Sequence, residues 1–476
     1  VDGVYMGRGR QYRAGFLDIE RVEVLRGPQG TLFGKNTVAG AVNITTASPD
    51  VGGETTGEIM ASFEENGGQN YQGFISGSLS DTLAARLAFN YRENDGYIEN
   101  EQFNTSEGGK TDEGVRLTLA WEPSDTFSAN LKVSHFEGER TGSNSATQQY
   151  LAPSQRDIDV PNRSAFAATA YAINDIFYPG LAATAGDDYT TFKDNNYGRS
   201  RADGVGISFG PDGSEDSVTN AALALNWELE GHTLTSITAY TGYEYQDDVD
   251  VDWLPLQFIA RYDDQQFDQF SQEIRLASDG GGMFDYVVGA YYEQSELEFY
   301  RRVTIDTNFD GLFPEYALLG ALAAGAPAGT PASAMPQNLL AVLTQGAYSA
   351  NQVARNHDFN LDSESYALFA QGTFNLSDSL RLTLGVRYTE ETKDVVSSQR
   401  LGDSNNGLDG KGTGYSPFLG IVQSTSFNTY NYDYADDRTT DAWTPSVNLQ
   451  WDVSADSMLY VSFSQGFKSG GFSAAD

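Results

Sequence analysis

The fold is decided by stretches such as Leu380-Arg381-Leu382-Thr383-Leu384-Gly385-Val386-Arg387-Tyr388-Thr389, in which large apolar residues alternate with polar or small ones. Successive side chains of a β-strand point to opposite faces of a sheet, so a period of two predicts a strand with one apolar and one polar face. Val115–Glu122 and Arg86–Arg92 show the same alternation. We therefore predict a chain built mainly from two-faced strands.

The connections between strands distinguish a membrane barrel from a soluble β-sandwich. The 13 predicted strands span residues 57–65, 69–80, 82–94, 113–122, 125–137, 216–230, 232–247, 265–278, 283–300, 362–376, 378–393, 440–453 and 456–467. Their links alternate between tight turns, rich in Ser, Asp and Gly, and long polar stretches. The long stretches are residues 138–215, 248–264, 301–361 and 394–439. Short turns on one side and long loops on the other are typical of outer-membrane barrels and unusual in a compact soluble domain.

The composition agrees with this interpretation and narrows the choice of partners. The 476 residues include no Cys, 50 Gly, 27 Tyr and 27 Phe, and the formal charge is −37. Such an excess of acid argues against nucleic acid as a partner. The charge is uneven, because residues 1–49 hold six Arg or Lys against four Asp or Glu. We therefore place a domain boundary near Ser48-Pro49.

One motif in the first 49 residues carries a family resemblance. It reads Ile19-Glu20-Arg21-Val22-Glu23-Val24-Leu25-Arg26-Gly27-Pro28-Gln29-Gly30-Thr31-Leu32-Phe33-Gly34-Lys35-Asn36 and continues to Ala39-Gly40-Ala41-Val42-Asn43-Ile44. This motif closely resembles the second half of the plug domain of TonB-dependent outer-membrane receptors. Gln272–Leu276, Gly385–Thr389 and Gly466–Phe472 resemble barrel segments of the same family.

The resemblance implies an all-β transmembrane barrel with an N-terminal plug domain in its lumen. Barrels of about 22 strands carry such plugs, so the 13 strands predicted here would be part of a larger barrel. Residues 1–49 would be the C-terminal part of the plug, and residues 50–476 the N-terminal part of the barrel with its extracellular loops. The sequence starts at Val1 without a signal peptide and ends at Ala475-Asp476. We expect it to lack the early plug, including the TonB box, and roughly the last nine strands.

By the same resemblance, the protein would import a scarce, large solute across the bacterial outer membrane. The energy would come from the TonB-ExbB-ExbD complex, and lipid and lipopolysaccharide would surround the barrel. A ferric siderophore is the commonest solute of similar proteins, and an oligosaccharide or cobalamin stays open. A barrel-anchored surface binding or adhesion protein and a passive porin are the alternatives from other classes.

The candidate ligand site is the segment near residues 5–13, which in the family leads to the plug apex. Arginine guanidinium groups suit anionic ligands through paired hydrogen bonds, and tyrosine rings can pack on an aromatic or sugar face. In the alternative interpretation, these arginines simply pair with acidic residues that face the lumen. The candidate residues are Tyr5, Arg8, Arg10, Tyr12 and Arg13.

A second candidate site is a plug–barrel lock. The resemblance implies that charged plug residues pair with barrel glutamates until energy arrives, and a purely structural role for the same pairs is the alternative. Ion pairs in a wet lumen are individually weak, which suits a reversible lock. The plug candidates are Glu20, Arg21, Glu23 and Arg26, and the barrel candidates are Glu273 and Glu390.

A structural calcium ion is the one cofactor that the sequence raises, and it does so weakly. Asp306, Asn308 and Asp310 match the start of a calcium loop, but Ala317 stands where the pattern expects a bidentate Glu. A solvated acidic loop is the commoner explanation.

An enzyme is not expected. Gly206–Gly210 matches G-x-S-x-G but lies in a Gly/Asp-rich stretch without a strand-to-helix context. The three histidines, His135, His232 and His357, are widely separated, so the sequence offers neither a catalytic triad nor a histidine metal cluster.

Overall fold

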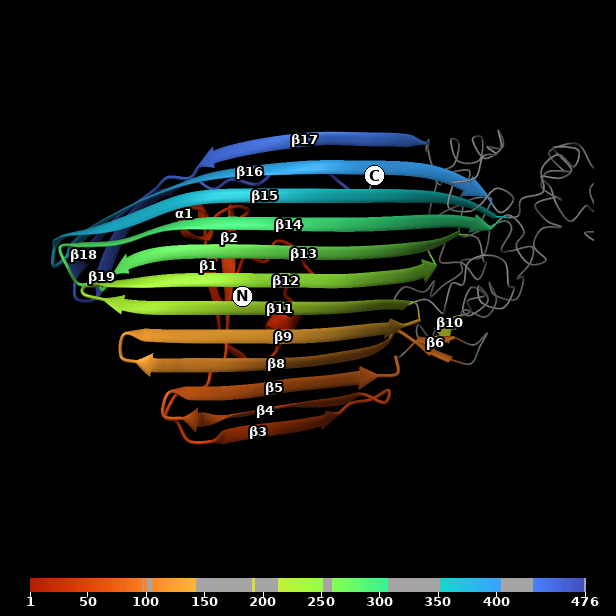
Figure 1. The fold of residues 1–476 in the computed structure, drawn as a ribbon, viewed down its shortest axis with the longest axis horizontal. Coiled ribbons are helices and arrows are strands. Elements are labelled where there is room, and N and C mark those ends of the chain that lie inside the picture. Colours follow the sequence, from red (N-terminus) through yellow and green to blue (C-terminus); the bar gives the residue numbers. More distant parts are fainter. Residues whose placement is uncertain are drawn as a thin grey trace, which may run out of the picture.

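A computed structural model describes most of the chain, and in it the strands form one large curved sheet (Figure 1). The residues described are 1–96, 98–100, 105–142, 191–192, 213–250, 259–306, 352–403 and 431–474. The sheet has 14 antiparallel strands, in the order β3-β4-β5-β8-β9-β11-β12-β13-β14-β15-β16-β18-β19, with β17 also paired to β16. Sequence neighbours are therefore neighbours in space, as in an up-and-down barrel wall. The prediction of an all-β fold is confirmed.

The strands grow longer towards the middle of the sheet. Their bounds are β3 Thr56–Phe63, β4 Gln69–Ser80, β5 Leu83–Asn94, β8 Gly109–Ser124, β9 Phe127–Thr141, β11 Gly213–Leu229, β12 His232–Asp250, β13 Ile259–Ser278, β14 Phe284–Asp306, β15 Gln352–Ser377, β16 Leu380–Asp403, β17 Tyr432–Trp443, β18 Ser446–Ser454 and β19 Ser457–Ser464. Three short strands, β6 Ile98–Asn100, β7 Thr105–Glu107 and β10 Thr191–Phe192, form a separate small sheet that the sequence did not predict. Within the described residues, the structure contains no helix long and apolar enough to cross a membrane.

β17 and β18 are two halves of one strand. Trp443 pairs with Tyr388 of β16, and Ser446 pairs with Gly385, so only Thr444 and Pro445 interrupt the ladder. Proline has no N–H to donate to a neighbouring strand. The predicted strand 440–453 thus corresponds to the end of β17 and the whole of β18.

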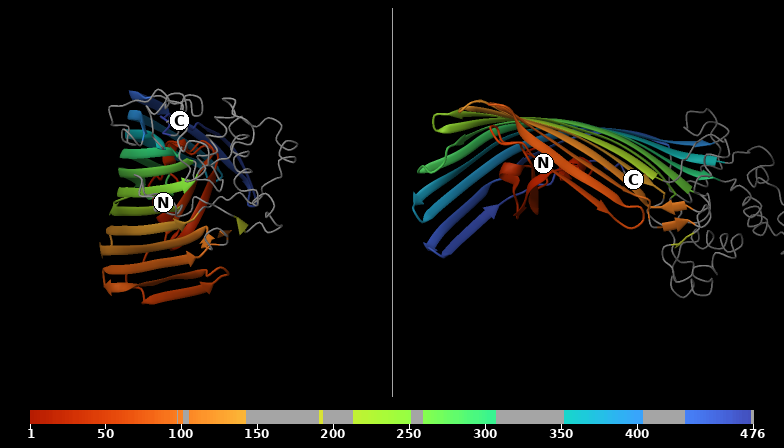
Figure 2. Two further views of the ribbon diagram at one scale, coloured as in Figure 1. Left: turned by 90° about the vertical axis from the view of Figure 1, so that its right-hand side faces the viewer. Right: turned by 90° about the horizontal axis from the view of Figure 1, so that it is seen from below.

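The two faces of the wall have opposite chemistry over the segment Leu380–Thr389. Leu384 and Val386 are 41% and 39% exposed, whereas Arg387 and Thr389 on the other face are 5% and 2% exposed. The sheet curves strongly, and its concave side is the polar face in this region (Figure 2). The convex face is thus the apolar one, as the lipid-facing side of a barrel wall requires.

Aromatic side chains mark two levels on the convex face. Near the tight turns, Phe127 contacts both Trp121 and Trp227, with ring centroids 5.8 and 5.2 Å apart. On β15, Phe374 and Tyr366 mark the lower and upper levels. They are eight positions apart in the sequence, or about 27 Å along the strand; a strand tilt of about 35–45° reduces this to about 20 Å, somewhat less than the ~25 Å apolar band of outer-membrane barrels. We call the upper level the tyrosine belt; it contains Tyr292, Tyr366 and Tyr388.

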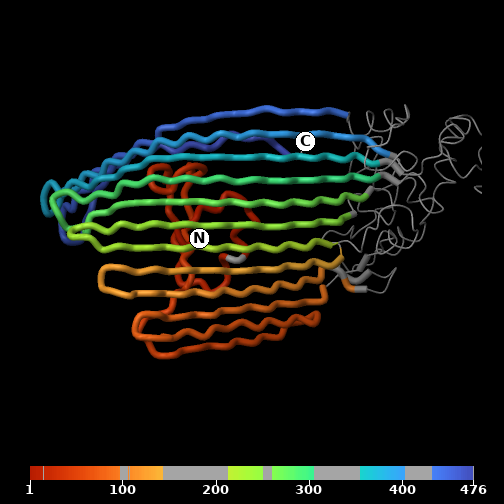
Figure 3. Tube along the Cα trace, viewed as in Figure 1, coloured from red at the N-terminus to blue at the C-terminus, as the bar shows by residue number. Residues whose placement is uncertain are grey.

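Residues 1–49 form a separate unit on the concave side of the wall (Figures 1 and 2). It contains η1 Arg13–Phe16, β1 Ile19–Arg26, α1 Gly30–Phe33 and β2 Gly40–Thr46. β1 and β2 make a two-stranded antiparallel sheet that runs across the direction of the wall strands (Figure 3). Gly40 begins β2 with φ of 151°, and a Cβ there would lie 2.3 Å from the Leu25 carbonyl oxygen, so only glycine fits. We call residues 1–49 the N-terminal unit.

Candidate functional site

The most buried ion pairs between the N-terminal unit and the wall, within the described residues, are made by Lys35. This residue follows α1, and its Nζ donates to Oε1 of Glu293 on β14 at 2.8 Å and to Oε1 of Glu391 on β16 at 2.6 Å. The three side chains are 10%, 4% and 2% exposed. Burial lowers the pKa of Lys35, but the two carboxylates outweigh it and raise this pKa above its ordinary value. The ammonium group is thus held charged between two strands that are not adjacent.

The Lys35 contact belongs to a larger network that includes the segment after β19. The Lys393 Nζ lies 3.0 Å from Oε2 of Glu391 and donates to the Ser469 hydroxyl at 2.6 Å. Ser469 in turn donates its hydroxyl to Glu391 and its backbone N–H to the Asn36 side-chain oxygen at 3.1 Å. Residues of the N-terminal unit, β16 and the segment following β19 are therefore joined at one place.

Three further ion pairs connect the N-terminal unit to other wall strands. Arg86 of β5 binds both carboxylate oxygens of Asp18, with distances of 2.7 Å from Nε and 2.6 Å from a terminal nitrogen. The other two pairs are Lys132 of β9 with Asp2 at 2.8 Å and Arg13 with Asp216 of β11 at 2.6 Å. Together with Lys35, these pairs anchor the unit to strands spread across the wall.

The predicted apex residues occupy several environments. Arg10 lies over the ring of Tyr245 at 3.1 Å from the centroid, and Arg8 lies over Phe267 at 4.9 Å. Arg13 instead pairs with the buried carboxylate of Asp216, as the alternative interpretation stated.

The two predicted tyrosines also differ from each other. The Tyr5 hydroxyl accepts a hydrogen bond from Asn36 at 2.8 Å, and its ring lies 5.5 Å from the Lys35 Nζ. Tyr12 is 41% exposed and packs edge-on against Phe16. Of the five candidates, Arg8 and Arg10 are the two cations that lie against aromatic rings of the wall and form no ion pair within the described residues.

The predicted lock pairs are not among the ion pairs that the described residues form. Glu20, Arg21 and Arg26 are exposed on β1, and Arg21 pairs with Glu23 of the same strand at 3.3 Å. β1 is hydrogen-bonded to β2 and to no described strand of the wall, and its charged residues form no ion pair with Glu273 or Glu390.

Of the two predicted barrel residues, Glu390 points to the outer face of the wall and therefore cannot meet the N-terminal unit. Glu390 follows the apolar positions Val386 and Tyr388 in steps of two and therefore points outward, where it accepts a hydrogen bond from the Tyr388 hydroxyl at 2.9 Å. Its neighbour Glu391 points inward and meets Lys35. Glu273 does face inward but pairs with Arg275 at 3.3 Å.

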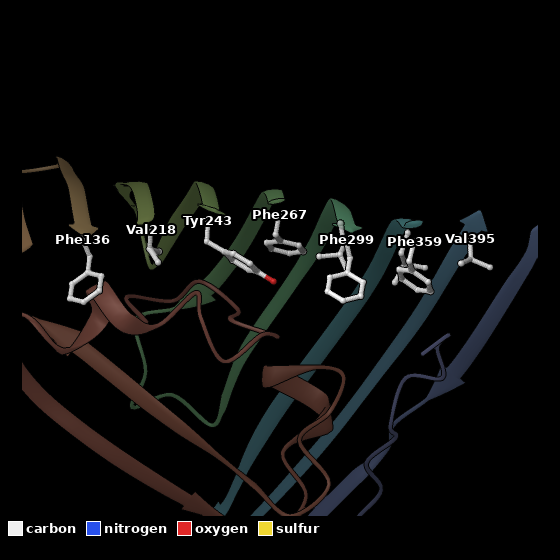
Figure 4. Packing of buried hydrophobic residues seen from close by; sticks show 9 residues of the cluster. Phe136, Val218, Tyr243, Phe267, Phe299, Phe359 and Val395 are labelled. Atoms are coloured by element: carbon white, nitrogen blue, oxygen red, sulfur yellow. The ribbon is translucent and has the colours of Figure 1, made fainter. Parts of the chain in front are cut away.

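An apolar row crosses the concave face above these contacts (Figure 4). It consists of Phe136, Val218, Tyr243, Phe267, Leu297, Phe299, Phe359, Leu361 and Val395, all buried, on seven strands from β9 to β16. The labelled side chains point to the side on which the N-terminal unit lies (Figure 4). Because Arg8 lies over Phe267, the row and the cationic segment of the unit meet. We call this set the inner apolar row.

The inner apolar row was not predicted, although the sequence contains a signal for it. On β14 the apolar residues Val288 and Tyr292 occupy even, outward positions, whereas Leu297 and Phe299 occupy odd, inward positions. The apolar phase thus changes face just above the tyrosine belt. Above the membrane the convex face does not contact lipid. Apolar residues at that height of a strand therefore indicate a surface that faces the lumen.

Of the three calcium candidates, Asp306 is the last residue of β14. Asn308 and Asp310 lie outside the described residues, and the described part of the chain contains no group of three His, Cys, Asp or Glu residues suited to a metal ion.

A curved antiparallel wall that is apolar outside, polar inside and edged with aromatic residues defines the class of outer-membrane β-barrel proteins. Within that class, a model of the family described as "TonB dependent receptor-like, beta-barrel" matches residues 180–475. The chain belongs to this family, whose members are receptors and transporters of the bacterial outer membrane.

Individual relatives are distant. The vitamin B12 transporter BtuB of Photobacterium profundum is 24% identical over 277 residues, which are 53% of this chain and 44% of that protein. The pesticin receptor of Yersinia pestis is 34% identical over 90 residues, 19% of this chain and 10% of its own length.

Solved structures share the fold at lower identity. The ferric yersiniabactin uptake receptor FyuA of Yersinia pestis has a TM-score of 0.63 at 15% identity and is matched over 97% of this chain and 54% of its own. The ferripyoverdine receptor of Pseudomonas aeruginosa has a TM-score of 0.57 at 13% identity, over 99% of this chain and 50% of its own. The chain thus spans about half the length of these receptors.

Proposed function

We propose that the protein imports a solute across the outer membrane with energy delivered by TonB. In this proposal, residues 1–49 are the C-terminal part of a plug and residues 50–476 are the N-terminal part of the barrel. The observation that carries it is the placement of the N-terminal unit on the concave side, joined to the wall by the buried contacts of Lys35. In a passive porin, a unit inside the lumen would obstruct diffusion through the channel.

The solute we propose is an anionic metal chelate of the ferric siderophore class. Arg8 and Arg10 lie against aromatic rings at the edge of the inner apolar row, so a ligand there would meet guanidinium groups and apolar side chains together. Carboxylate, hydroxamate or catecholate groups would bind the guanidinium groups, and the ligand backbone would pack on the row. The names of the FyuA and ferripyoverdine receptors point to the same class of solute.

Cobalamin is the second candidate, because the matched BtuB transporter carries vitamin B12 in its name and covers more of this chain than the pesticin receptor does. The corrin ring of cobalamin also has a large apolar face that could pack on the inner apolar row. An oligosaccharide is less well supported, since the inner apolar row offers mostly aliphatic and phenyl groups where sugars need polar partners.

The Lys35 network would serve as the plug–barrel lock. Removing one partner of a buried ion pair leaves the other charge buried and uncompensated, which is strongly unfavourable. Withdrawal of Lys35 from Glu293 and Glu391 therefore needs an outside source of energy. TonB, driven by ExbB and ExbD, would supply it after ligand binding.

Growth assays test the function. The gene is deleted, and uptake of ferric siderophores and of cobalamin is measured with TonB active and inactivated. We expect loss of uptake of one ferric chelate in both the deletion strain and the TonB-deficient strain. If every tested solute enters normally without the gene, the import proposal is wrong; if cobalamin alone is lost, the siderophore assignment is wrong.

A further inference from the structure

A groove on the convex, outward face of the wall lies at the level of the tyrosine belt. It has a volume of about 530 Å³, within the range of small-molecule sites. Its main lining residues are Ile274, Ala290, Tyr292, Tyr366, Leu368 and Tyr388. These residues belong to the outward phase of β13, β14, β15 and β16, so the groove opens to the membrane and not to the lumen.

The groove exists because a small residue sits among large ones. Ala290 of β14 pairs with Ile274 on one side and with Leu368 on the other. One outward position higher on these strands, the rings of Tyr292 and Tyr366 stand 5.0 Å apart between centroids. The methyl group of Ala290 thus forms a floor between aliphatic and aromatic walls.

The upper rim of the groove is polar and negatively charged. The Tyr292 and Tyr366 hydroxyls both donate to Oε1 of Glu364, at 3.0 and 2.6 Å, and the Tyr388 hydroxyl donates to Glu390. Each tyrosine therefore has its ring in the groove and its hydroxyl at the rim, the orientation that tyrosine adopts at a membrane interface. The residues that form groove and rim include no Lys or Arg.

We propose that this groove binds one acyl chain of an outer-membrane lipid whose headgroup carries an amine. Hydrocarbon is the medium that this face meets, and an unfilled groove would forfeit the dispersion contacts of its lining. The rim selects the headgroup, because the carboxylates of Glu364 and Glu390 would repel a bare phosphate and attract an ammonium group. The proposal depends on the lipid-facing position of the groove and not on which solute the protein imports.

Photocrosslinking tests the acyl-chain site. The complete receptor, purified from outer membranes, is incubated with phosphatidylethanolamine that carries a diazirine on its acyl chain, and crosslinked peptides are mapped. We expect crosslinks concentrated around Ala290 and Leu368. An even distribution over the outward positions of the wall would overturn the proposal.

A matched pair of variants tests the acyl-chain site a second way, by filling the groove in one variant only. Ala290→Trp fills the floor of the groove, whereas Ala221→Trp adds the same ring to an outward position of β11 that does not line it. We expect a severalfold loss of crosslinking at Leu368 in the first variant and none in the second. Equal yields would contradict the proposal. Heat-modifiable gel migration verifies that each variant is folded, and Ala290→Leu replaces Ala290→Trp if the larger side chain prevents folding.

The headgroup is tested with lipids of identical chains. The wild-type receptor should capture phosphatidylethanolamine severalfold better than phosphatidylglycerol, and the double variant Glu364→Gln, Glu390→Gln should lose this preference. Glutamine still accepts the tyrosine hydrogen bonds, so the change removes charge and little else. If the wild type captures both lipids equally, the assignment of an amine headgroup is wrong.

Discussion

Replacing Lys35 with methionine removes the ammonium group that joins the N-terminal unit to two wall strands, with little change in the length of the side chain. The carboxylates of Glu293 and Glu391, whose side chains are 4% and 2% exposed, then stay buried without their main counter-ion. Glu391 keeps Lys393 at 3.0 Å, and Glu293 keeps the hydrogen bond from the Tyr291 hydroxyl at 2.7 Å, so the loss is partial.

The expected cost follows from these contacts. Breaking a buried ion pair costs about 3–5 kcal/mol, and the remaining partners place Lys35→Met at about 3 kcal/mol, the lower end of that range. Since each 1.4 kcal/mol is a factor of ten, detachment of the unit should become on the order of a hundredfold more frequent.

Hydrogen exchange measures this change directly. Amides of α1 and β2 should lose protection in Lys35→Met, while amides in the middle of β14 and β15 should not. Arg21→Met is the matched control, because the Arg21–Glu23 pair is exposed at 54% and 44% and an exposed pair contributes at most about 1 kcal/mol. Equal protection of the N-terminal unit in the two variants would refute the assignment of Lys35 as its main anchor.

Three further predictions concern the same region. Glu391→Gln should lower protection of the N-terminal unit, whereas Glu390→Gln should leave it unchanged, since one carboxylate points inward and the other outward; the two exchange profiles decide this. Because the folded pKa of Lys35 is raised, its contribution to stability is complete below the ordinary lysine pKa of about 10.4 and is lost only as the pH rises through the higher folded value. Protection of the unit, corrected for the intrinsic exchange rate, should therefore not fall between about pH 8 and 10. The double variant Arg8→Ala, Arg10→Ala should weaken binding of the imported ferric chelate about tenfold or more, given ~0.5–2 kcal/mol for each desolvated cation contact; calorimetry that shows unchanged affinity would rule out their role.

Much of the wall could be predicted from the sequence, since lipid requires a strict apolar period on one face. Every predicted strand has a counterpart, and the tight turn at Ser80-Asp81 ends β4 at the residue expected. The upper ends were underestimated: β15 was predicted at 362–376 and spans Gln352–Ser377. Above the membrane, backbone pairing continues while the outward apolar pattern stops, so the period loses its signal before the strand ends.

The contacts of the N-terminal unit were less predictable, because they depend on which wall residue a loop reaches in three dimensions. Lys35 was part of the quoted motif, yet no spacing in the sequence connects it to Glu293. The sequence alone could have shown that Glu391, and not Glu390, faces the lumen. Every second residue counted from Leu380 lies on the lipid face, and Glu390 is one of them. Glu390 was chosen because it lies in a family-like segment, and Glu391, which was not predicted, is distinguished from it only by the face of the strand to which it points.

The change of apolar phase above the tyrosine belt has a consequence for assembly. A strand that paired one residue out of register would reverse both of its halves at once. Below the belt, Arg387 would turn towards hydrocarbon, which is unfavourable for an arginine; above it, side chains such as Phe299 and Phe359 would turn from the lumen into water. Hydrocarbon below the belt and water above it therefore both disfavour the same slip in register.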